Sequence, residues 1–242
     1  REVLHAFATH ADLNIECRLL PDGGPARWIA LVGRADYANP AVRDSPARFL
    51  RQEIVDKVLL KDLPGLAGIG DTRALNRVFS VLAWHTGSEI GLEELSRQTG
   101  VGKLKLADHL AYLESAGLLR RVHRLDDDGA RMQRERTFRV HLTNPAMRAA
   151  LFGLVAANDP AMDRLCATAI WSQWLHAPDA GGSVHCMRWK AGRQTLEVDL
   201  VALDADSHRP RTALSVQWLA PAAGEPDEPR ALRALAQRHP LG

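Results

Sequence analysis

The sequence predicts a mixed α+β or α/β fold, in which a helical region with a small hairpin precedes a small mixed sheet. Two patterns lead to this prediction. Apolar residues recur at helical spacing between residues 71 and 115, and three later runs between residues 184 and 219 have the composition of strands. With 242 residues, of which 46% are hydrophobic and 25% charged, the chain can form one large or two small cores.

Composition narrows the classes of partner. A net charge of +2 is too small for a protein that coats nucleic acid, so any DNA contact must come from a local basic patch. The three cysteines lie far apart, which argues against a disulfide framework or a thiolate zinc site and favours the cytoplasm. The longest small apolar run, AALFGLVAA, is about half a membrane span, so we expect no membrane partner.

The first 64 residues predict a hairpin followed by a helix. Two strand-like runs, NIECRLL and ARWIALV, flank the turn-forming run PDGGP. Ser45 or Asp44 can cap the following helix, Pro46 suits its first turn, and Pro64-Gly65 ends it. The run GLAGIGD that follows lacks the Lys-Ser/Thr of a phosphate-binding loop, so we interpret it as a linker.

Residues 71–142 give the clearest element order. TRALNRVFSVLAWHTG predicts an amphipathic helix, and GLEELSRQTGVGKLKLADHLAYLESAGLL predicts two helices joined by a glycine turn. LLRRVHRL and RERTFRVHL then predict two extended runs around the turn DDDGA. A helix, a helix–turn–helix and a hairpin follow one another in a winged helix-turn-helix.

A winged helix usually binds duplex DNA through its second helix and its wing. The candidate DNA-binding residues are Lys103, Lys105, Tyr112, Arg120, Arg121, Arg124, Arg134 and Arg136. Asp108 on the same helix and the acidic run at 126–128 would repel phosphates, which instead favours a module that packs against another protein. Both interpretations stay open from the sequence.

The last third predicts one helix and three strands. A helix over 160–176 begins after Asp159-Pro160, and VHCMRW, TLEVDLVALD and TALSVQWL are strand-like. This is the outline of a restriction-endonuclease-like core. Glu197 and Asp199 alternate with apolar neighbours on one strand, so both carboxylates project to one face and are candidate ligands of a divalent ion such as Mg²⁺.

A working nuclease site would also need a cation beside the attacking water and a further acidic ligand on the next strand. Ser215 and Gln217 occupy those positions, and neither side chain carries a charge. Lys190 or Arg193, on the preceding hairpin, is the candidate for a relocated cation. The sequence therefore identifies no cofactor with certainty, and Mg²⁺ would be expected only if this site is active. The missing cation and the missing acidic ligand favour a chain without catalytic activity.

Isolated histidines and tryptophans also give expectations. His123 and His141 fall on the predicted wing strands, where we expect them at the surface or at a sheet edge. Tryptophans cluster in the last domain, and core filling explains them better than stacking on nucleobases. They are Trp171, Trp174, Trp189 and Trp218.

Taken together, residues 34–221 resemble the C-terminal half of a large prokaryotic AAA+ ATPase family. The stretches KVLLKDL, HLAYLESAGLLRRV, TFRVHLTNPAMRAALFG and MRWKAGRQTLEVDLVALD carry the likeness. Members of that family have a P-loop domain, a winged helix and a restriction-endonuclease-like domain of unknown function. The resemblance implies that Ala167 replaces a glutamate and that Ser215-Val216-Gln217 replaces a Glu-x-Lys, which indicates a degenerate active site.

The sequence thus predicts four segments: a hairpin and helical connector (1–64), a winged helix-turn-helix (65–150), a restriction-endonuclease-like domain (151–221) and a tail (222–242). The leading hypothesis is a non-catalytic DNA-associated or assembly module of an AAA+ ATPase system. Its expected partners are double-stranded DNA, an ATPase domain or subunit, and further copies of itself. The alternatives are a Mg²⁺-dependent DNA nuclease that uses Lys190, and a winged-helix transcriptional regulator.

Overall fold

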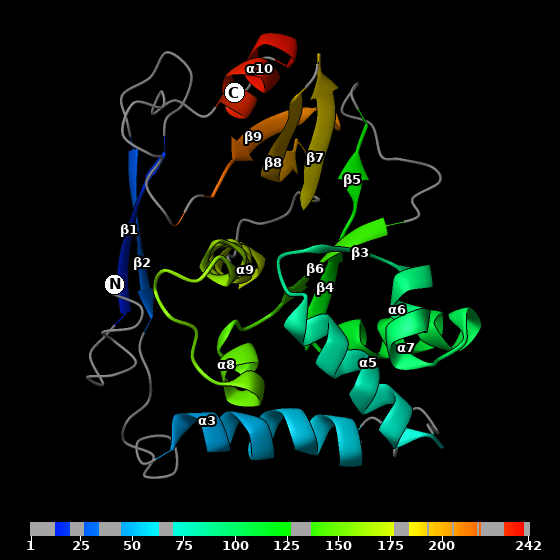
Figure 1. Ribbon diagram of the computed structural model, residues 1–242. Coiled ribbons are helices and arrows are strands. Elements are labelled where there is room, and N and C mark those ends of the chain that lie inside the picture. Colours follow the sequence, from blue (N-terminus) through cyan, green and yellow to red (C-terminus); the bar gives the residue numbers. More distant parts are fainter. Residues whose placement is uncertain are drawn as a thin grey trace. The chain divides into compact units, whose positions relative to one another are not determined.

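The chain divides into two compact units. The computed structural model describes residues 13–19, 27–33, 45–62, 70–126, 137–176, 184–192, 194–204, 206–216, 218 and 230–239 (Figure 1). The helical unit comprises Asp36–Arg121 and Arg136–Ser172. The sheet unit comprises Arg1–Ala35, Val122–Glu135 and Gln173–Gly242. Each unit therefore takes its residues from separate stretches of the sequence.

An antiparallel hairpin is the first described element of the sheet unit. β1 (Leu13–Leu19) pairs with β2 (Arg27–Gly33), with Ile15 opposite Leu31. The hairpin predicted from the two strand-like runs is confirmed, and the PDGGP run between them lies outside the described residues.

A helical run begins the described part of the helical unit. α3 (Pro46–Phe49) follows Ser45, and Pro46 occupies the first turn, where its missing N–H costs no hydrogen bond. The run continues as two π-helical stretches, η1 (Leu50–Asp56) and η2 (Val58–Asp62). A helix was predicted here, and most of it has the wider i→i+5 turn. Among the side chains of this run that the structure describes, Val55 and Leu59 are fully buried. The glycine-rich run predicted as a linker lies outside the described residues as far as residue 69.

Helix α5 (Thr72–Trp84) confirms the amphipathic helix predicted from the sequence. The Asp71 side chain caps the helix by accepting a hydrogen bond from the backbone N–H of Ala74 at 2.9 Å. The apolar residues at helical spacing are buried in the core of the helical unit. They are Leu75, Val78, Phe79, Leu82 and Ala83.

The predicted helix–turn–helix follows. β3 (Glu89–Gly91) leads into α6 (Leu92–Thr99), and a short turn joins α6 to α7 (Lys103–Ser115). Gly100 in this turn has a φ of +70°, a conformation that glycine adopts without a steric penalty. The predicted apolar stripe of α7 is fully buried. It consists of Leu106, Leu110 and Leu113.

Three strands complete the helical unit in the order β3-β6-β4. β4 (Leu119–Val122) and β6 (Thr137–Leu142) come from the two predicted extended runs. β6 is the central strand and also pairs with β3, with Ile90 opposite Phe138. Every residue of β6 after Thr137 is buried.

The expectation that His141 lies at the surface is wrong, because His141 is on β6 and only 1% exposed. Arg139, on the same strand, is 6% exposed. Both residues are buried because β6 is the central strand of its sheet and packs within the unit. His123 is half-buried and lies between β4 and β5 (Arg124–Leu125).

The run LLRRVHRL was predicted as a single wing strand, and the structure divides it between two sheets. Its first half is β4, whereas β5 pairs in parallel with β7 (Val184–Ala191) in the sheet unit. The His123 carbonyl accepts hydrogen bonds from the Cys186 backbone N–H at 3.3 Å and from the His185 ring at 3.2 Å. Arg124, opposite Cys186, therefore belongs to the sheet unit.

Two helices follow β6 along the chain. α8 (Ala146–Phe152) is short, and α9 (Ala161–His176) matches the predicted helix over 160–176. The Asp159 side chain accepts a hydrogen bond from the Ala161 backbone N–H at 2.8 Å, as expected at a helix start. α9 lies in the helical unit as far as Ser172.

The tryptophans do not form one cluster. Trp171 belongs to the helical unit and Trp189 to the sheet unit, although the sequence grouped both in the last domain. They are 7% and 4% exposed, so the interpretation as core residues is correct for both.

The four-stranded sheet of the sheet unit has the order β5-β7-β8-β9. β8 (Gln194–Leu203) confirms the predicted strand TLEVDLVALD. β9 (Pro210–Leu214) contains only the start of the predicted run TALSVQWL and ends before Ser215, which was predicted on this strand. Helix α10 (Arg230–Arg238), within the segment predicted as a tail, packs against one face of the sheet (Figure 1), where Leu235 is fully buried with Trp189. The fold is thus mixed α+β, and no described helix is long and apolar enough to cross a membrane.

Candidate functional site

The carboxylate pair predicted on β8 contains one ion-paired side chain. Glu197 lies opposite Arg188 of β7 in the register of the two strands. The Nε atom of Arg188 is 3.8 Å from Oε2 of Glu197, and the two side chains are 48% and 38% exposed. Such a pair contributes little to stability, but it places a guanidinium where a metal site would need an open carboxylate. Sequence reasoning considered Lys190 and overlooked this arginine.

The second carboxylate, Asp199, accepts hydrogen bonds within the fold. Its Oδ2 atom accepts from the Val216 backbone N–H at 2.8 Å and from the Ser215 hydroxyl at 3.4 Å. The register of β7 against β8 shifts between His185 and Met187, next to this position. Asp199 thus ties β8 to the segment that follows β9. Ser215, identified as a replaced catalytic position, is a donor to this carboxylate.

Of the remaining nuclease candidates, Lys190 is on the same sheet as the carboxylate pair. Lys190 lies opposite Thr195, two positions along β7 from Arg188. Ala167 is buried in α9 of the helical unit, and Arg193 and Gln217 lie outside the described residues. Among the described residues, no group of three or more His, Cys, Asp or Glu side chains could hold a metal ion. The arrangement is that of polar contacts on a sheet face.

The first turn of α7 is the most exposed part of the helix–turn–helix. Lys103, Leu104 and Lys105 are exposed, and Leu104 is 87% exposed. The ammonium of Lys103 lies 3.4 Å from a carboxylate oxygen of Glu93, an exposed contact that water screens. Asp108 is exposed one turn further along the helix.

Two other predicted DNA contacts, Tyr112 and Arg121, also form contacts within the helical unit. Tyr112 is half-buried against the core of the helical unit. The Arg121 guanidinium donates to one oxygen of Glu114 at 2.9 and 2.6 Å, and the Arg121 backbone N–H donates to the other at 2.8 Å. Arg121 also lies over the Phe138 ring at 5.8 Å. Its neighbour Arg120 is exposed. Arg134 and Arg136 lie outside the described residues.

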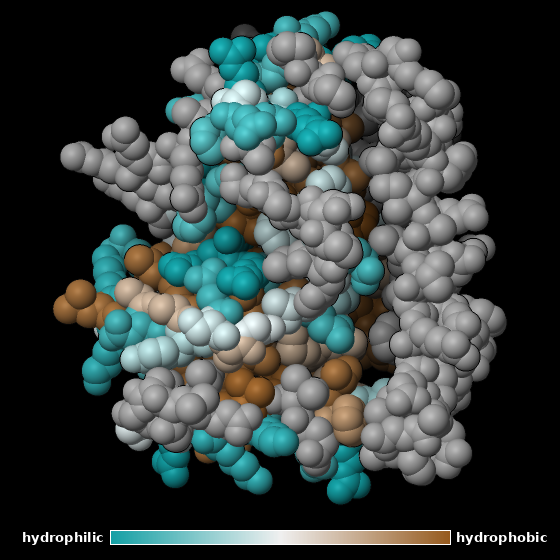
Figure 2. All heavy atoms as spheres, turned by 180° about the vertical axis from the view of Figure 1, so that it is seen from behind, coloured by the Kyte–Doolittle hydropathy of each residue, from teal (hydrophilic) through white to brown (hydrophobic). Residues whose placement is uncertain are grey.

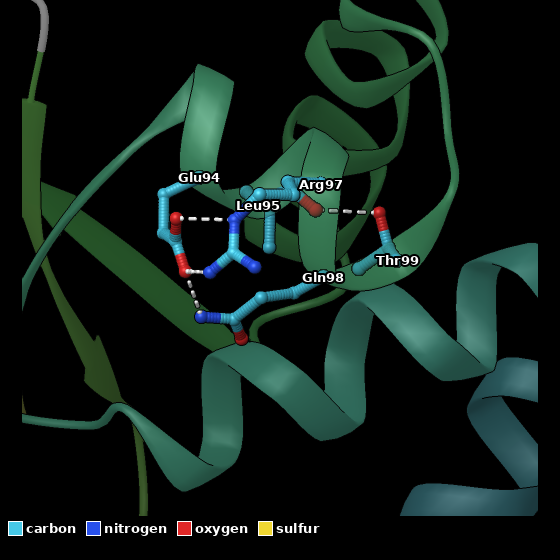
Figure 3. A network of polar contacts seen from close by, with 5 residues as sticks. All are labelled: Glu94, Leu95, Arg97, Gln98 and Thr99. Carbon is cyan, nitrogen blue, oxygen red and sulfur yellow. Dashed lines mark hydrogen bonds and ion pairs between the residues drawn. The ribbon is translucent and has the colours of Figure 1, made fainter.

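A network of polar contacts joins side chains on the surface of α6, the helix before α7 (Figure 3). Glu94 accepts two hydrogen bonds from Arg97, at 3.0 and 2.5 Å, and one from Gln98 at 2.6 Å. These bonds, those from Arg97 first, lower the pKa of Glu94 to about 2. The hydroxyl of Thr99 donates to the Leu95 carbonyl at 2.7 Å, at the end of the helix. Arg97 and Glu94 therefore offset each other's charge.

A family model described as "Domain of unknown function (DUF8612)" matches residues 37–158, just over half of the chain. The chain belongs to this family. No curated protein and no solved structure matches the chain. The DUF8612 range begins before α3, includes the helix–turn–helix and ends before α9, so it contains Lys103, Lys105 and Arg120 but not Glu197 or Asp199.

The DUF8612 range also contains a groove that sequence reasoning missed. It has a volume of about 390 Å³ and lies between α5 and the end of α6. Its lining residues are Arg73, Asn76, Arg77, Ser80, Val81 and Gln98. The first five share one face of α5 by helical spacing, which the sequence shows, but the contribution of Gln98 depends on how α6 packs.

A second overlooked feature is an exposed aromatic pair. Trp84 at the end of α5 and Phe152 at the end of α8 are 54% and 41% exposed, with ring centroids 5.2 Å apart in an edge-to-face arrangement. Arg148 lies 4.7 Å from the centre of the Trp84 ring, and Leu154 nearby in sequence is 68% exposed. On the face seen in Figure 2, hydrophobic side chains reach the surface between hydrophilic ones.

A buried chain of hydrogen-bonding groups ends at the imidazole of His141. The Leu142 backbone N–H donates to the Thr86 hydroxyl at 3.0 Å, which lies 3.0 Å from the Thr168 hydroxyl. The Thr168 oxygen lies 3.1 Å from Nδ1 of His141, and the imidazole stacks on Trp171 with centroids 5.3 Å apart. Burial lowers the pKa of His141 from 6.5 to about 3, so the ring is neutral at physiological pH.

Proposed function

We propose that the helical unit is a winged helix-turn-helix and that the chain is a non-catalytic, DNA-associated module of a prokaryotic AAA+ ATPase system in the cytoplasm. The order α5, β3, α6, α7, β4 and β6, with strand order β3-β6-β4, supports the winged-helix assignment. The link to an ATPase is supported by the sequence resemblance over residues 34–221.

The exposed first turn of α7 is the observation that carries the DNA proposal. A helix–turn–helix presents the N-terminal residues of its second helix to base edges in the major groove. Lys103 and Lys105 can pair with phosphates or guanine, and the aliphatic side chain of Leu104 can contact a thymine methyl group. These three residues are consecutive and all exposed.

The non-catalytic part of the proposal rests on β8. Glu197 faces Arg188, and Asp199 accepts hydrogen bonds from Ser215 and Val216. A metal ion bound by both carboxylates would have to compete with the Arg188 guanidinium for Glu197. We interpret the sheet unit as a restriction-endonuclease-like domain whose acidic residues now serve packing.

A salt titration of duplex binding tests the DNA proposal. Fluorescence anisotropy would be measured with a 20-base-pair duplex for the wild type, Lys103→Ala/Lys105→Ala, and the matched control Lys57→Ala/Lys61→Ala, whose lysines are exposed elsewhere in the helical unit. We expect the slope of log K against log salt to fall by about one for each α7 lysine that is removed, with no change in the control. Equal slopes for the two double variants would contradict the proposal.

A cleavage assay tests the non-catalytic part. Plasmid DNA would be incubated with the wild type and with Glu197→Ala/Asp199→Ala, in Mg²⁺ or Mn²⁺. We expect neither protein to cut. Cleavage by the wild type that the double variant has lost would favour the alternative, a nuclease in which Lys190 supplies the cation.

A second candidate function, self-assembly, is favoured by the exposed pair Trp84 and Phe152. Exposed aromatic and leucine side chains on a helical surface are typical of protein contacts. Sedimentation of the wild type and of Trp84→Ser/Phe152→Ser at increasing concentration would test it. We expect a wild-type oligomer that the double variant does not form; a wild type that remains monomeric would reject this candidate.

A further inference from the structure

The groove between α5 and α6 carries basic and amide side chains that neither the sequence hypotheses nor the family description assigns to a role. We propose that Arg73 and Arg77 make it a binding site for a phosphate group. In the DNA complex proposed above, on which this second step rests, the groove holds a backbone phosphate beside the major groove that α7 enters.

The spacing of the two arginines places both on one surface. Arg73 and Arg77 are one helical turn apart on α5, so their side chains emerge about 6 Å from each other along the helix axis. Both are exposed. Two guanidinium groups at this separation can surround one tetrahedral oxyanion, because each offers a planar fork of N–H donors.

Arg77 is already held in position. Its Nε donates to the Thr99 carbonyl at 3.3 Å, at the C-terminal end of α6. This bond uses one nitrogen, so the two terminal nitrogens can still donate to a ligand. A partly fixed side chain loses less conformational freedom on binding than a mobile one, which favours affinity.

The other polar side chains in the groove add further hydrogen-bond donors for an anion. The Ser80 hydroxyl donates to Oδ1 of Asn76 at 3.5 Å, which leaves the Asn76 amide nitrogen to bind an acceptor. Gln98 donates to Glu94 at 2.6 Å (Figure 3), and Val81 is the apolar member of the lining. The lining thus combines cations and amides, with no acidic side chain among its members.

The nearest acidic residue in this network does not oppose an anion strongly. Glu94 forms an ion pair with Arg97 and accepts a bond from Gln98. Its charge is therefore balanced by a cation that is not part of the lining. The positive charges of Arg73 and Arg77 can therefore interact with a bound anion, since none of the described residues that line the groove is acidic.

The position of the groove relates it to α7. Arg77 contacts Thr99, and the turn after Thr99 leads within four residues to Lys103 in the exposed first turn of α7. In helix–turn–helix proteins the helix before the recognition helix crosses the DNA backbone. A phosphate next to the end of α6 is therefore within reach of the arginines when α7 lies in the groove of the duplex.

Two probes separate a DNA phosphate from a free phosphate compound. Inorganic pyrophosphate would be titrated into the full chain, with NMR detection of the arginine Nε–H signals and of the backbone amides of α5 and Gln98. The 20-base-pair duplex would be titrated by anisotropy at several salt concentrations. The variants are Arg73→Ala, which leaves the Thr99 contact intact, and Arg73→Gln/Arg77→Gln. The matched control is Arg48→Gln/Arg51→Gln, whose arginines are exposed in α3 and η1.

We expect pyrophosphate to shift the Arg73 and Arg77 signals in the wild type and not in the double glutamine variant. We expect the DNA salt slope to fall by about one in Arg73→Ala and by about two in the double variant, with the control unchanged. Pyrophosphate binding without DNA binding would uphold the phosphate site while rejecting the proposed function. DNA binding that depends on Lys103 and Lys105 but not on the two arginines, without pyrophosphate shifts, would overturn this inference and leave the proposed function standing.

Discussion

At the scale of single residues, the buried histidine gives the clearest consequence of the fold. His141 lies on the central strand of its sheet, and its Nδ1 is 3.1 Å from the Thr168 hydroxyl. If Thr168 donates to Nδ1, the proton of the neutral ring is on Nε2, which has no hydrogen-bond partner among the described residues. A second proton would place a charge where burial disfavours it.

Stability should therefore depend on pH through His141. Its pKa is lowered to about 3 in the folded protein from 6.5, so the unfolded chain binds more protons between these values and stability falls as pH falls through this window. The loss is at most about 1.4 kcal/mol per pH unit. Urea unfolding at pH 7 and pH 5 should show a smaller loss for His141→Asn than for the wild type. The exposed His208→Asn, at a φ of 55° that asparagine tolerates, should keep the wild-type loss. A wild-type loss in His141→Asn would contradict the assignment.

At the scale of elements, a glycine allows α9 to approach the turn before β3. Gly87 has a φ of +78°, and a Cβ added there would lie 2.5 Å from the backbone oxygen of Arg164 in α9. A backbone oxygen cannot move away as a flexible side chain can. Gly87→Ala should therefore cost well over 2 kcal/mol in urea unfolding. Gly100→Ala is the matched control, because its φ is +70° but nothing lies within 4 Å, and it should cost about 1 kcal/mol. Similar losses in the two variants would show that the contact with Arg164 is unimportant.

The link between α7 and β4 gives a second prediction at this scale. Glu114 and Arg121 are 26% or less exposed and are joined by three hydrogen bonds across the turn between the two elements. Arg121→Ala should lower the free energy of unfolding by about 1–2 kcal/mol, since it removes the two charge-assisted side-chain bonds to Glu114 and keeps only the bond from the backbone N–H. Arg120→Ala, which changes the exposed neighbour, should have almost no effect. Equal losses would mean that the link does not stabilise the unit.

The elements that the sequence predicted best are those with a local pattern. The stripe of Leu106, Leu110 and Leu113 could be predicted from helical periodicity alone. The end of α6 could be predicted from Gly100, because glycine is common at the C-terminal ends of helices. The division of LLRRVHRL between two sheets was not predictable, because strand composition does not specify the partner strand. For the same reason the burial of His141 depends on the pairing of β6 with both neighbours.

The candidate sites show the same limit. The alternation that placed Glu197 and Asp199 on one face was visible in the sequence. Their partners were not, because Arg188 faces Glu197 through the strand register and Val216 reaches Asp199 from beyond β9. Similarly, the spacing of Arg73 and Arg77 is local, but the contact of Arg77 with Thr99 crosses from one helix to another.

At the scale of the whole molecule, charge is distributed so that local patches matter more than the total. The net charge of the chain is only +2, but the cations are locally concentrated. The exposed lysines lie on α7, and the two groove arginines lie on α5 beside the end of α6. Arg97 and Arg121 form close ion pairs with carboxylates, at 2.5 and 2.6 Å, whereas the contact of Lys103 with Glu93 is 3.4 Å long and exposed. Under the DNA-binding proposal, affinity should therefore follow the local cations rather than the net charge.

Each unit also has a hydrophobic core of its own, and the two cores share no described residue. Leu235 is fully buried in the core of the sheet unit, and Leu110 in that of the helical unit. Truncation of a buried leucine to alanine costs about 2–5 kcal/mol, which should raise local opening in the affected unit. We expect amide hydrogen exchange to show lost protection in β7 and β8 for Leu235→Ala, and in α5 and α7 for Leu110→Ala. Lost protection throughout the chain in both variants would mean that the units unfold as one, because their stabilities would then be coupled.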